Sequence, residues 1–505
     1  MNTVSKTLSV APIGFHGEIV EVESDVTNGL PAFQVVGMGN KAIDEARERV
    51  KSAIKNSKLD FPAKRITVNL APAELPKDGS HFDLAIALSV LASSGQLRQN
   101  ELSDAVFAGE LALNGGIRPV RSIITIVEAA KKQGASAVFV PAENAEQASL
   151  IEDIDIFPVA DLSSLFLHLK NEAVIAPYAR SAKTDKIDAY DGPFIDDVVG
   201  QEQAKRALVI AAAGHHNLLL NGSPGAGKTM LAQLIPDLLP TLSAEEKISI
   251  TKLHSMTGEA IKSTVTARPF RAPHHSASRA ALLGGGTASG PGDVSLAHLG
   301  VLFLDEMPEY PRSLLESLRQ PLEDKQITIS RANRHNTYPA DFMLVGTMNP
   351  CPCGYYGDLA KECTCTSSQI LNYQKRLSGP FLDRIDLYVS VTRVPHKDLI
   401  ASKSESKTQH KLFRDQIKNA RALQNNRYKS SSKNNGNIKS SDVKKYISLT
   451  PESQNLLDKA AAKLDLSARS YFKTIKVART IADLDQSDTI NVNHISEALQ
   501  YRQTS

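Results

Sequence analysis

The strongest chemical signal in the sequence is a glycine-rich turn between an apolar run and an amphipathic, helix-like segment. The apolar run NLLL occupies 217–220, and GSPGAGKT follows at 222–229. Glycines let backbone N–H groups approach phosphate oxygens, and the helix start adds the positive end of its dipole. Lys228 is expected to reach the β- and γ-phosphates, and Thr229 to ligate Mg²⁺. The pattern predicts a nucleotide site built from Gly222, Ser223, Pro224, Gly225, Ala226, Gly227, Lys228 and Thr229.

Two later apolar segments end in polar residues that suit the same site. GVLFL ends at Asp305 and Glu306, and FMLVGTM ends at Asn349. We expect Asp305 to hold Mg²⁺ and Glu306 to polarise the attacking water. Asn349 is a candidate for orienting that water, although an asparagine before Pro350 is also an ordinary turn former. Together these residues predict hydrolysis of ATP with Mg²⁺.

All four cysteines lie within the segment 351–365, CPCGYYGDLAKECTC. Four thiolates as C-x-C and C-x-C can form a closed, tetrahedral structural zinc site. The C-x-C spacing is tight, but Pro352, Gly354 and Gly357 supply turn residues that could wrap the ligands. Unliganded packing thiols, or disulfides and redox sensing, are the alternatives. The predicted zinc ligands are Cys351, Cys353, Cys363 and Cys365.

Length and composition indicate a soluble protein with several cores. A chain of 505 residues suggests about three domains. Apolar runs such as the one from His81 are broken before the ~20 residues that a membrane span needs. The N-terminal residues lack the pattern of a secretory signal, and clustered cysteines fit a reducing compartment, so we expect a cytoplasmic protein. A net charge of +3 does not by itself imply nucleic-acid binding.

The order of apolar and amphipathic segments predicts an α/β protein with a helical C-terminal part. Strand-like runs such as GEIVEVESDV and RITVNLAP alternate with helix-like segments in residues 1–170. Polar sequence at 171–193 is the expected linker, 194–394 the nucleotide-binding unit, and 395–505 a set of helices. Within that last part, the Ser/Asn/Lys-rich segment 427–442 is interpreted as a solvated loop.

The nucleotide motifs resemble those of AAA+ ATPases, whose core is a parallel sheet sandwiched by helices with a C-terminal helical lid. The resemblance makes Asn349 sensor 1 and makes Gln201, in Val-Gly-Gln, an adenine contact. SGPFLDRID at 378–386 resembles the arginine-finger segment, so Arg384 would enter a neighbouring subunit's site. A finger acting between subunits implies a homo-hexameric ring. Arg469 is the sensor 2 candidate and Arg479 its alternative.

Two insertions resemble those of magnesium-chelatase-like and replicative-helicase-like AAA+ proteins. RPFRAPHH at 268–275, with the glycine-rich residues after it, resembles the helix-2 insert, and 324–339 resembles the pre-sensor-1 hairpin. In ring helicases both insertions face the central channel, where basic side chains can track a phosphate backbone. The DNA-binding candidates are Arg331, Arg334, Arg271 and Arg279.

The N-terminal segment resembles the Lon protease domain at LPKDGSHFDL, FAGELAL and VFVPAEN. Lon-type proteolysis needs a serine nucleophile activated by a lysine. On that pattern the serine position holds His81 and the lysine position Ile124, with Ser80 next to the first. Since isoleucine cannot accept a proton, we expect a non-proteolytic domain.

The whole domain order is similar to the ComM/YifB family, with RPFRAPHH, LGVLFLDE, NPCPCGYYGD and SGPFLDRIDL as its most specific stretches. The resemblance implies an ATP-driven DNA motor, or helicase, that promotes branch migration during recombination of incoming single strands. Its partners would be single-stranded and branched DNA and recombination proteins. The alternative is a chelatase-like remodelling chaperone without DNA activity. A scaffold without ATP turnover is disfavoured because the expected catalytic positions are filled.

Overall fold

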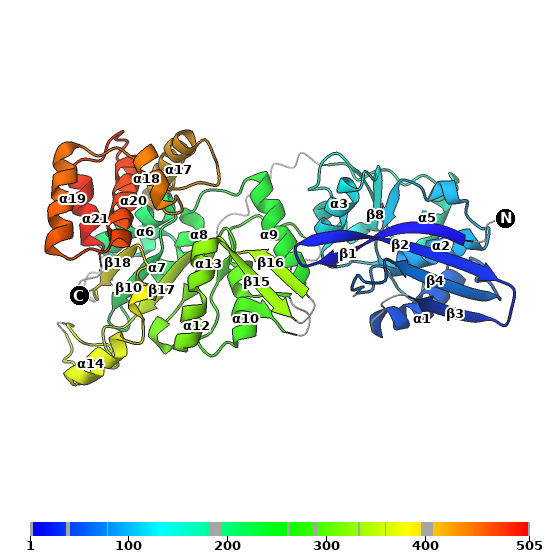
Figure 1. Cartoon of the computed structure of the whole chain (residues 1–505), viewed down its shortest axis with the longest axis horizontal. Helices are drawn as coiled ribbons and strands as arrows, with labels where there is room; N and C mark the ends of the chain where they lie inside the picture. The colour runs from blue at the N-terminus through cyan, green and yellow to red at the C-terminus, as the bar shows by residue number, and fades with distance from the viewer. Residues whose placement is uncertain are drawn as a thin grey trace.

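The chain forms two lobes, which Figure 1 shows side by side along the long axis of the molecule. At 41–44, 331 and 334 only the backbone is described. The computed structural model describes residues 4–36, 41–77, 79–180, 193–259, 263–286, 290–331, 334–358, 360–394 and 408–502. In this described part, no helix is long and apolar enough to cross a membrane.

The N-terminal lobe is built on a seven-stranded mixed sheet with the order β3-β4-β2-β1-β5-β8-β9. The apolar run from His81 is a buried helix, α2, packed on β1 and β2. The strands are β1 (Val4–Ile13), β2 (His16–Thr27), β3 (Ala32–Val36), β4 (Arg65–Ala71), β5 (Ala105–Phe107), β8 (Ala137–Pro141) and β9 (Asp155–Val159), with the small hairpin β6 (Glu110–Leu111) and β7 (Ile117–Arg118). The helices are α1 (Lys41–Asn56), α2 (Asp83–Ser93), α3 (Ile123–Lys132), α4 (Ala145–Ala148) and α5 (Leu162–Leu169).

The second lobe contains a five-stranded parallel sheet with the order β11-β14-β17-β10-β18. Leu218 and Leu220 face one buried cluster and Leu219 the other, as alternation along a strand requires, so both faces of the sheet are covered. The strands are β10 (Leu218–Gly222), β11 (Phe270–Arg271), β14 (Val301–Leu304), β17 (Met343–Met348) and β18 (Leu387–Val391). The helices are α6 (Glu202–Gly214), α7 (Lys228–Gln233), α8 (Ile235–Leu238), α9 (Ala244–Thr257), α12 (Arg312–Ser317), α13 (Arg319–Asp324), α14 (Ser367–Gln374) and α15 (Gly379–Leu382).

Two segments of this unit, which we call the insertions, stand outside the five-stranded sheet. The first carries the short helices α10 (Arg279–Leu283) and α11 (Asp293–Leu296) and the two-residue strands β12 (Gly284–Gly285) and β13 (Gly290–Pro291). The second is an antiparallel hairpin of β15 (Gln326–Arg331) and β16 (Arg334–Pro339). Arg331 pairs with Arg334 in the ladder, so both stand at the outer end of the hairpin.

The C-terminal part is helical and packs against α6 of the second lobe. The predicted solvated loop is wrong for residues 434–438. Asn435 is fully buried, and its amide donates to Thr480 Oγ1 (3.0 Å) and Asp483 Oδ2 (2.8 Å). The amide can be buried because these two acceptors take the place of water. The helices are α17 (Thr408–Tyr428), α18 (Ser440–Tyr446), α19 (Pro451–Lys463), α20 (Ala468–Leu484) and α21 (Val492–Gln500).

The turn between β1 and β2 joins the two lobes. Phe15 packs into an apolar cluster formed by α9, the first insertion and the β15–β16 hairpin. Lys252 on α9 lies 4.2 Å from the centre of the Phe15 ring and 2.5 Å from Glu128 on α3. A Cβ atom on Gly14 would lie 3.0 Å from Asn336 on β16. The N-terminal lobe therefore braces the hairpin, as the meeting of the lobes in Figure 1 shows.

The positions that correspond to the Ser–Lys dyad of Lon proteases hold His81 and Ile124. Ile124 is buried inside α3, and His81 packs against Phe82 with ring centres 4.0 Å apart. The hydroxyl of neighbouring Ser80 donates to Glu110. Ser80 therefore has a carboxylate as its partner, and the position of the lysine in a Ser–Lys dyad holds an apolar side chain.

Candidate active site

The carboxyl ends of the parallel strands meet at one edge of the sheet, which we call the carboxyl edge. The loop 222–227 leaves the end of β10 there, and α7 begins at Lys228. Gly225 and Gly227 have φ of 79° and 86°, values that glycine adopts without strain. A Cβ atom on either would meet no atom within 4 Å, so the loop backbone faces the open room that phosphate oxygens need.

The ammonium group of Lys228 lies at the centre of this edge. Its Nζ donates to Asn349 Oδ1 (3.0 Å) and to the carbonyls of Ser223 (3.2 Å) and Gly222. Burial lowers the pKa of Lys228, and the charges of Asp305 and Glu306 oppose that effect. In this structure the three acceptors take up the N–H donors of the Lys228 ammonium group. Phosphate oxygens would accept from these same donors when a nucleotide binds.

The carboxylate of Asp305 is held by two hydroxyl groups. Thr229 Oγ1 donates to Asp305 Oδ2 (3.3 Å), and Thr347 Oγ1 donates to Asp305 Oδ1 (2.5 Å). The Thr229 hydroxyl and the Asp305 carboxylate are oxygen ligands of the kind that Mg²⁺ prefers, so these residues fit the ion.

Glu306 follows in a left-handed conformation with φ of 48°, which is unusual for a residue with a side chain. Its backbone N–H donates to Thr347 Oγ1 (2.9 Å). Thr347 is fully buried in β17 and thus fixes both acids at once. Sequence reasoning missed Thr347; its only signal was a hydroxyl residue two positions before Asn349.

Gln201 lies at the same edge, just before α6, with φ of 59°. Its side-chain amide donates to the carbonyl of Thr392, which directly follows β18. Gly222 is paired with Val391 in the sheet, so Gln201 and the phosphate loop are neighbours.

Arg384 and Arg469 lie at the opposite edge, where the parallel strands begin. The side chain of Asn217, directly before β10, donates to the carbonyl of Arg384 (2.8 Å). The five residues of β10 run from this point to Gly222, a span of about 15 Å. In the described part of the chain, neither arginine side chain contacts the phosphate loop; both bind Glu323, at 2.5 Å and 2.8 Å.

Arg479, the alternative to Arg469 as sensor 2, is buried among the C-terminal helices. Its side chain is 1% exposed and its guanidinium pairs with Asp483 at 3.0 Å. It also donates to the carbonyls of Ser487 and Asp488. A guanidinium that is buried and engaged in this way is not available to a nucleotide.

The DNA-binding candidates differ in their surroundings. Arg271 is neutralised by two carboxylates, Asp293 at 2.7 Å and Glu259 at 2.9 Å. Arg279 is exposed at the start of α10. Arg331 and Arg334 pair with each other at the outer end of the β15–β16 hairpin, and their side chains lie outside the described residues.

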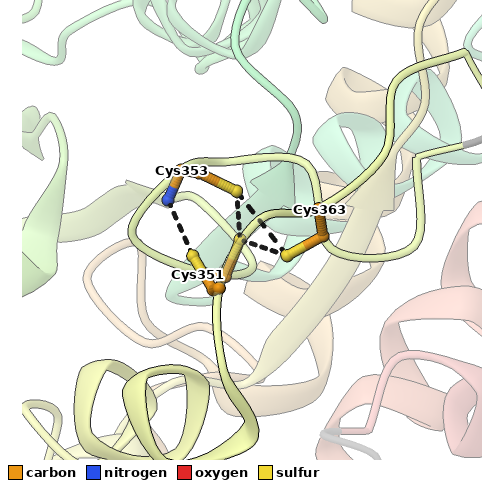
Figure 2. Close-up of side chains that lie close together, drawn as sticks. Cys351, Cys353 and Cys363 are labelled. Carbon is orange, nitrogen blue, oxygen red and sulfur yellow. Dashed lines mark hydrogen bonds between the residues drawn. The ribbon is translucent and has the colours of Figure 1, made fainter.

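The four cysteine sulfurs converge on one point, as Figure 2 shows with Cys351, Cys353 and Cys363 labelled. All four lie within 4.8 Å of one another, and Cys351 Sγ is 3.3 Å from Cys353 Sγ and 3.6 Å from Cys363 Sγ. A tetrahedral zinc site with bonds of about 2.3 Å needs sulfurs about 3.8 Å apart, whereas a disulfide needs about 2 Å. The backbone N–H of Tyr355 lowers the pKa of Cys353, which favours a thiolate there, whereas burial and the neighbouring sulfurs raise the pKa values of Cys363 and Cys365. The four residues therefore fit a metal ion.

A parallel sheet with a phosphate loop, an acid pair and a polar sensor along one edge defines an AAA+ nucleotide-binding protein. Residues 194–399 match the family model for magnesium chelatase, subunit ChlI, 22–144 match subunit ChlI of Mg-chelatase, and 407–502 match the magnesium chelatase subunit ChlI C-terminal model.

Proteins that are similar to this chain over nearly its whole length indicate which family of AAA+ proteins it belongs to. The chain is 41% identical over 497 residues to the uncharacterized protein YifB of Escherichia coli, covering 97% of this chain and 96% of YifB. It is 41% identical over 497 residues to the competence protein ComM of Haemophilus influenzae, covering 98% and 96%. A Lon protease of Mycolicibacterium smegmatis is 26% identical over 169 residues, 31% of this chain and 21% of that protein. The chain belongs to the ComM/YifB family of magnesium-chelatase-like AAA+ proteins, a membership that indicates an ATPase using ATP and Mg²⁺.

Proposed function

We propose that the chain hydrolyses ATP at sites completed by a neighbouring copy in a ring, a hexamer by analogy with the family. The observation that carries this proposal is the position of Arg384 and Arg469 at the edge opposite the phosphate loop. Neither can serve its own chain's nucleotide across about 15 Å of sheet. Both are placed to serve a nucleotide that a second copy presents.

The residues of the carboxyl edge divide the chemistry among them. Lys228 binds the β- and γ-phosphates, and Thr229 and Asp305 hold Mg²⁺, which neutralises phosphate charge when bound. Glu306 polarises the attacking water. Asn349, whose Oδ1 is released from Lys228 when the phosphates take that donor, orients the water. Gln201 borders the adenine. From the next subunit, Arg384 leaves Glu323 and stabilises the charge that develops on the phosphoryl group, with Arg469 beside it.

We further propose that hydrolysis moves DNA through the ring and promotes branch migration of incoming single strands. The printed name of the Haemophilus relative, competence protein, supports a role in DNA handling. The β15–β16 hairpin supports it by presenting Arg331 and Arg334 together at its end, with Arg279 exposed on the neighbouring insertion. Arg271 contributes less, because two carboxylates already hold it. Recombination proteins are the expected partners.

The cysteine cluster is proposed to hold one structural Zn²⁺. Four thiolates leave no open coordination position, so the ion stabilises the loop and takes no part in hydrolysis. Zinc analysis of the purified protein tests this: one ion per chain, lost on Cys→Ser substitution, supports it. The N-terminal lobe is proposed to be a non-proteolytic brace.

The deciding experiment for the motor uses purified protein, ATP, Mg²⁺ and a labelled three-stranded or Holliday junction. We expect junction-stimulated hydrolysis and strand movement, both lost in Glu306→Gln, which retains nucleotide binding. Hydrolysis without any response to the junction would reject the DNA motor and favour a chelatase-like remodelling ATPase.

A further inference from the structure

The cysteine loop 351–365 packs directly on the phosphate loop. Gly354, next to Cys353, has φ of 85° and is buried. A Cβ atom at Gly354 would lie 2.6 Å from both Cδ and Cγ of Pro224. Real Cβ atoms do not approach carbon that closely, so only glycine allows the two loops to meet.

A polar contact fixes the same pair of loops from a second side. The Ser223 hydroxyl donates to the Asp358 carboxylate, which is 5% exposed. Arg393, two residues after β18, donates from Nε (3.1 Å) and Nη2 (2.8 Å) to the carbonyl of Pro224. Its guanidinium also lies 3.6 Å from Asp358. Ser223 and Pro224 are thus clamped between Asp358 and Arg393.

The sulfur cluster is the contact that ties the two ends of the cysteine loop together. In the described residues, 351–365 contain turns and no helix or strand. A loop of this kind keeps considerable conformational entropy unless a cross-link removes it. Coordination of Cys351 and Cys353 would fix the backbone on both sides of Pro352 and place Gly354 against Pro224. Asn349 lies two residues before Cys351 and accepts a hydrogen bond from Lys228, so fixing the backbone at Cys351 also restricts the position of Asn349 beside Lys228.

We propose that the four-cysteine metal site is a positioning element for the phosphate loop, so that nucleotide affinity depends on bound Zn²⁺. This inference rests on the proposed ATP site and adds a structural control of it. The metal acts through Gly354 and Asp358 on Pro224 and Ser223, and it does not touch the nucleotide. Removing the metal frees the loop 351–365 and loosens the phosphate loop that it supports.

The test compares two glycine substitutions in the full chain. Gly354 and Gly357 both have positive φ, 85° and 78°, so alanine strains the backbone similarly at each. Only position 354 meets Pro224, because nothing lies within 4 Å of a Cβ at 357. Titration with a fluorescent ATP analogue and Mg²⁺, together with zinc content, separates contact from strain. We expect Gly354→Ala to raise Kd about tenfold or more with zinc retained, and Gly357→Ala to stay within about twofold.

Two further measurements keep the test decisive if Gly354→Ala folds poorly. Asp358→Asn, which leaves the backbone alone, is expected to raise Kd several-fold with zinc retained. Stripping zinc from the wild-type chain with a chelator is expected to raise Kd, and added Zn²⁺ to restore it. Equal affinities for both glycine variants, or an unchanged Kd after zinc loss, would overturn the inference. A wild-type chain that binds no nucleotide would instead reject the proposed ATP site.

Discussion

The buried hydroxyl of Thr347 offers a sharp test of how the acid pair is held. Thr347→Val keeps the shape of the side chain and removes only the hydroxyl, which donates to Asp305 and accepts from the N–H of Glu306. Each lost hydrogen bond is worth about 1 kcal/mol, so about 2 kcal/mol of restraint on the two acids disappears. If all of it acts on the transition state, kcat falls about thirtyfold.

Steady-state hydrolysis measures this effect, with nucleotide binding and thermal melting as companions. We expect a lower kcat and a nearly unchanged Kd for ATP, because Lys228 and the phosphate loop are intact. Thr347→Ser is the matched control: it keeps the hydroxyl and should hydrolyse ATP within about threefold of wild type. A Thr347→Val protein with wild-type kcat and wild-type stability would refute the role of this hydroxyl in orienting Asp305 and Glu306.

Three other predictions address the nucleotide, the DNA and the brace. Lys228→Ala should lower the rate of ATP hydrolysis, measured as phosphate release, by about 100-fold or more, because the positive charge of the lysine no longer stabilises the phosphates. Replacing Arg331 and Arg334 by Ala should spare basal hydrolysis and reduce the salt dependence of DNA affinity by about one to two in slope; an unchanged slope would count against these positions. Phe15→Ala should destabilise the contact between the lobes by about 2 kcal/mol, seen as faster proteolysis between them; unchanged proteolysis would mean the brace is weak.

The sequence was most informative where the chemistry is local. The phosphate loop needs closely spaced glycines, at 222, 225 and 227, and the four cysteines lie within one segment, so spacing alone was enough to single out both sets of residues. Thr347 escaped prediction because its partners, Asp305 and Glu306, are brought to it only by the pairing of β14 with β17.

Packing between residues far apart in the sequence also explains the other features of the structure that the sequence did not predict. Composition marks 427–442 as a solvated loop, yet Asn435 is buried because Thr480 and Asp483 on α20 satisfy its amide. The pairing of β1 with β5, nearly a hundred residues away, is equally invisible in local periodicity. Likewise, no pattern announces that Arg384 and Arg469 share Glu323.

The central claim, a site completed between copies, is tested most directly by mixing two inactive variants. Lys228→Ala lacks the phosphate-binding amine, and Arg384→Ala lacks the group expected from the neighbour. In randomly mixed rings with equal amounts of each, about one interface in four pairs an intact Lys228 with an intact Arg384. The account predicts that the mixture recovers about a quarter of wild-type hydrolysis. A mixture as inactive as its components, in rings shown to contain both, would contradict it.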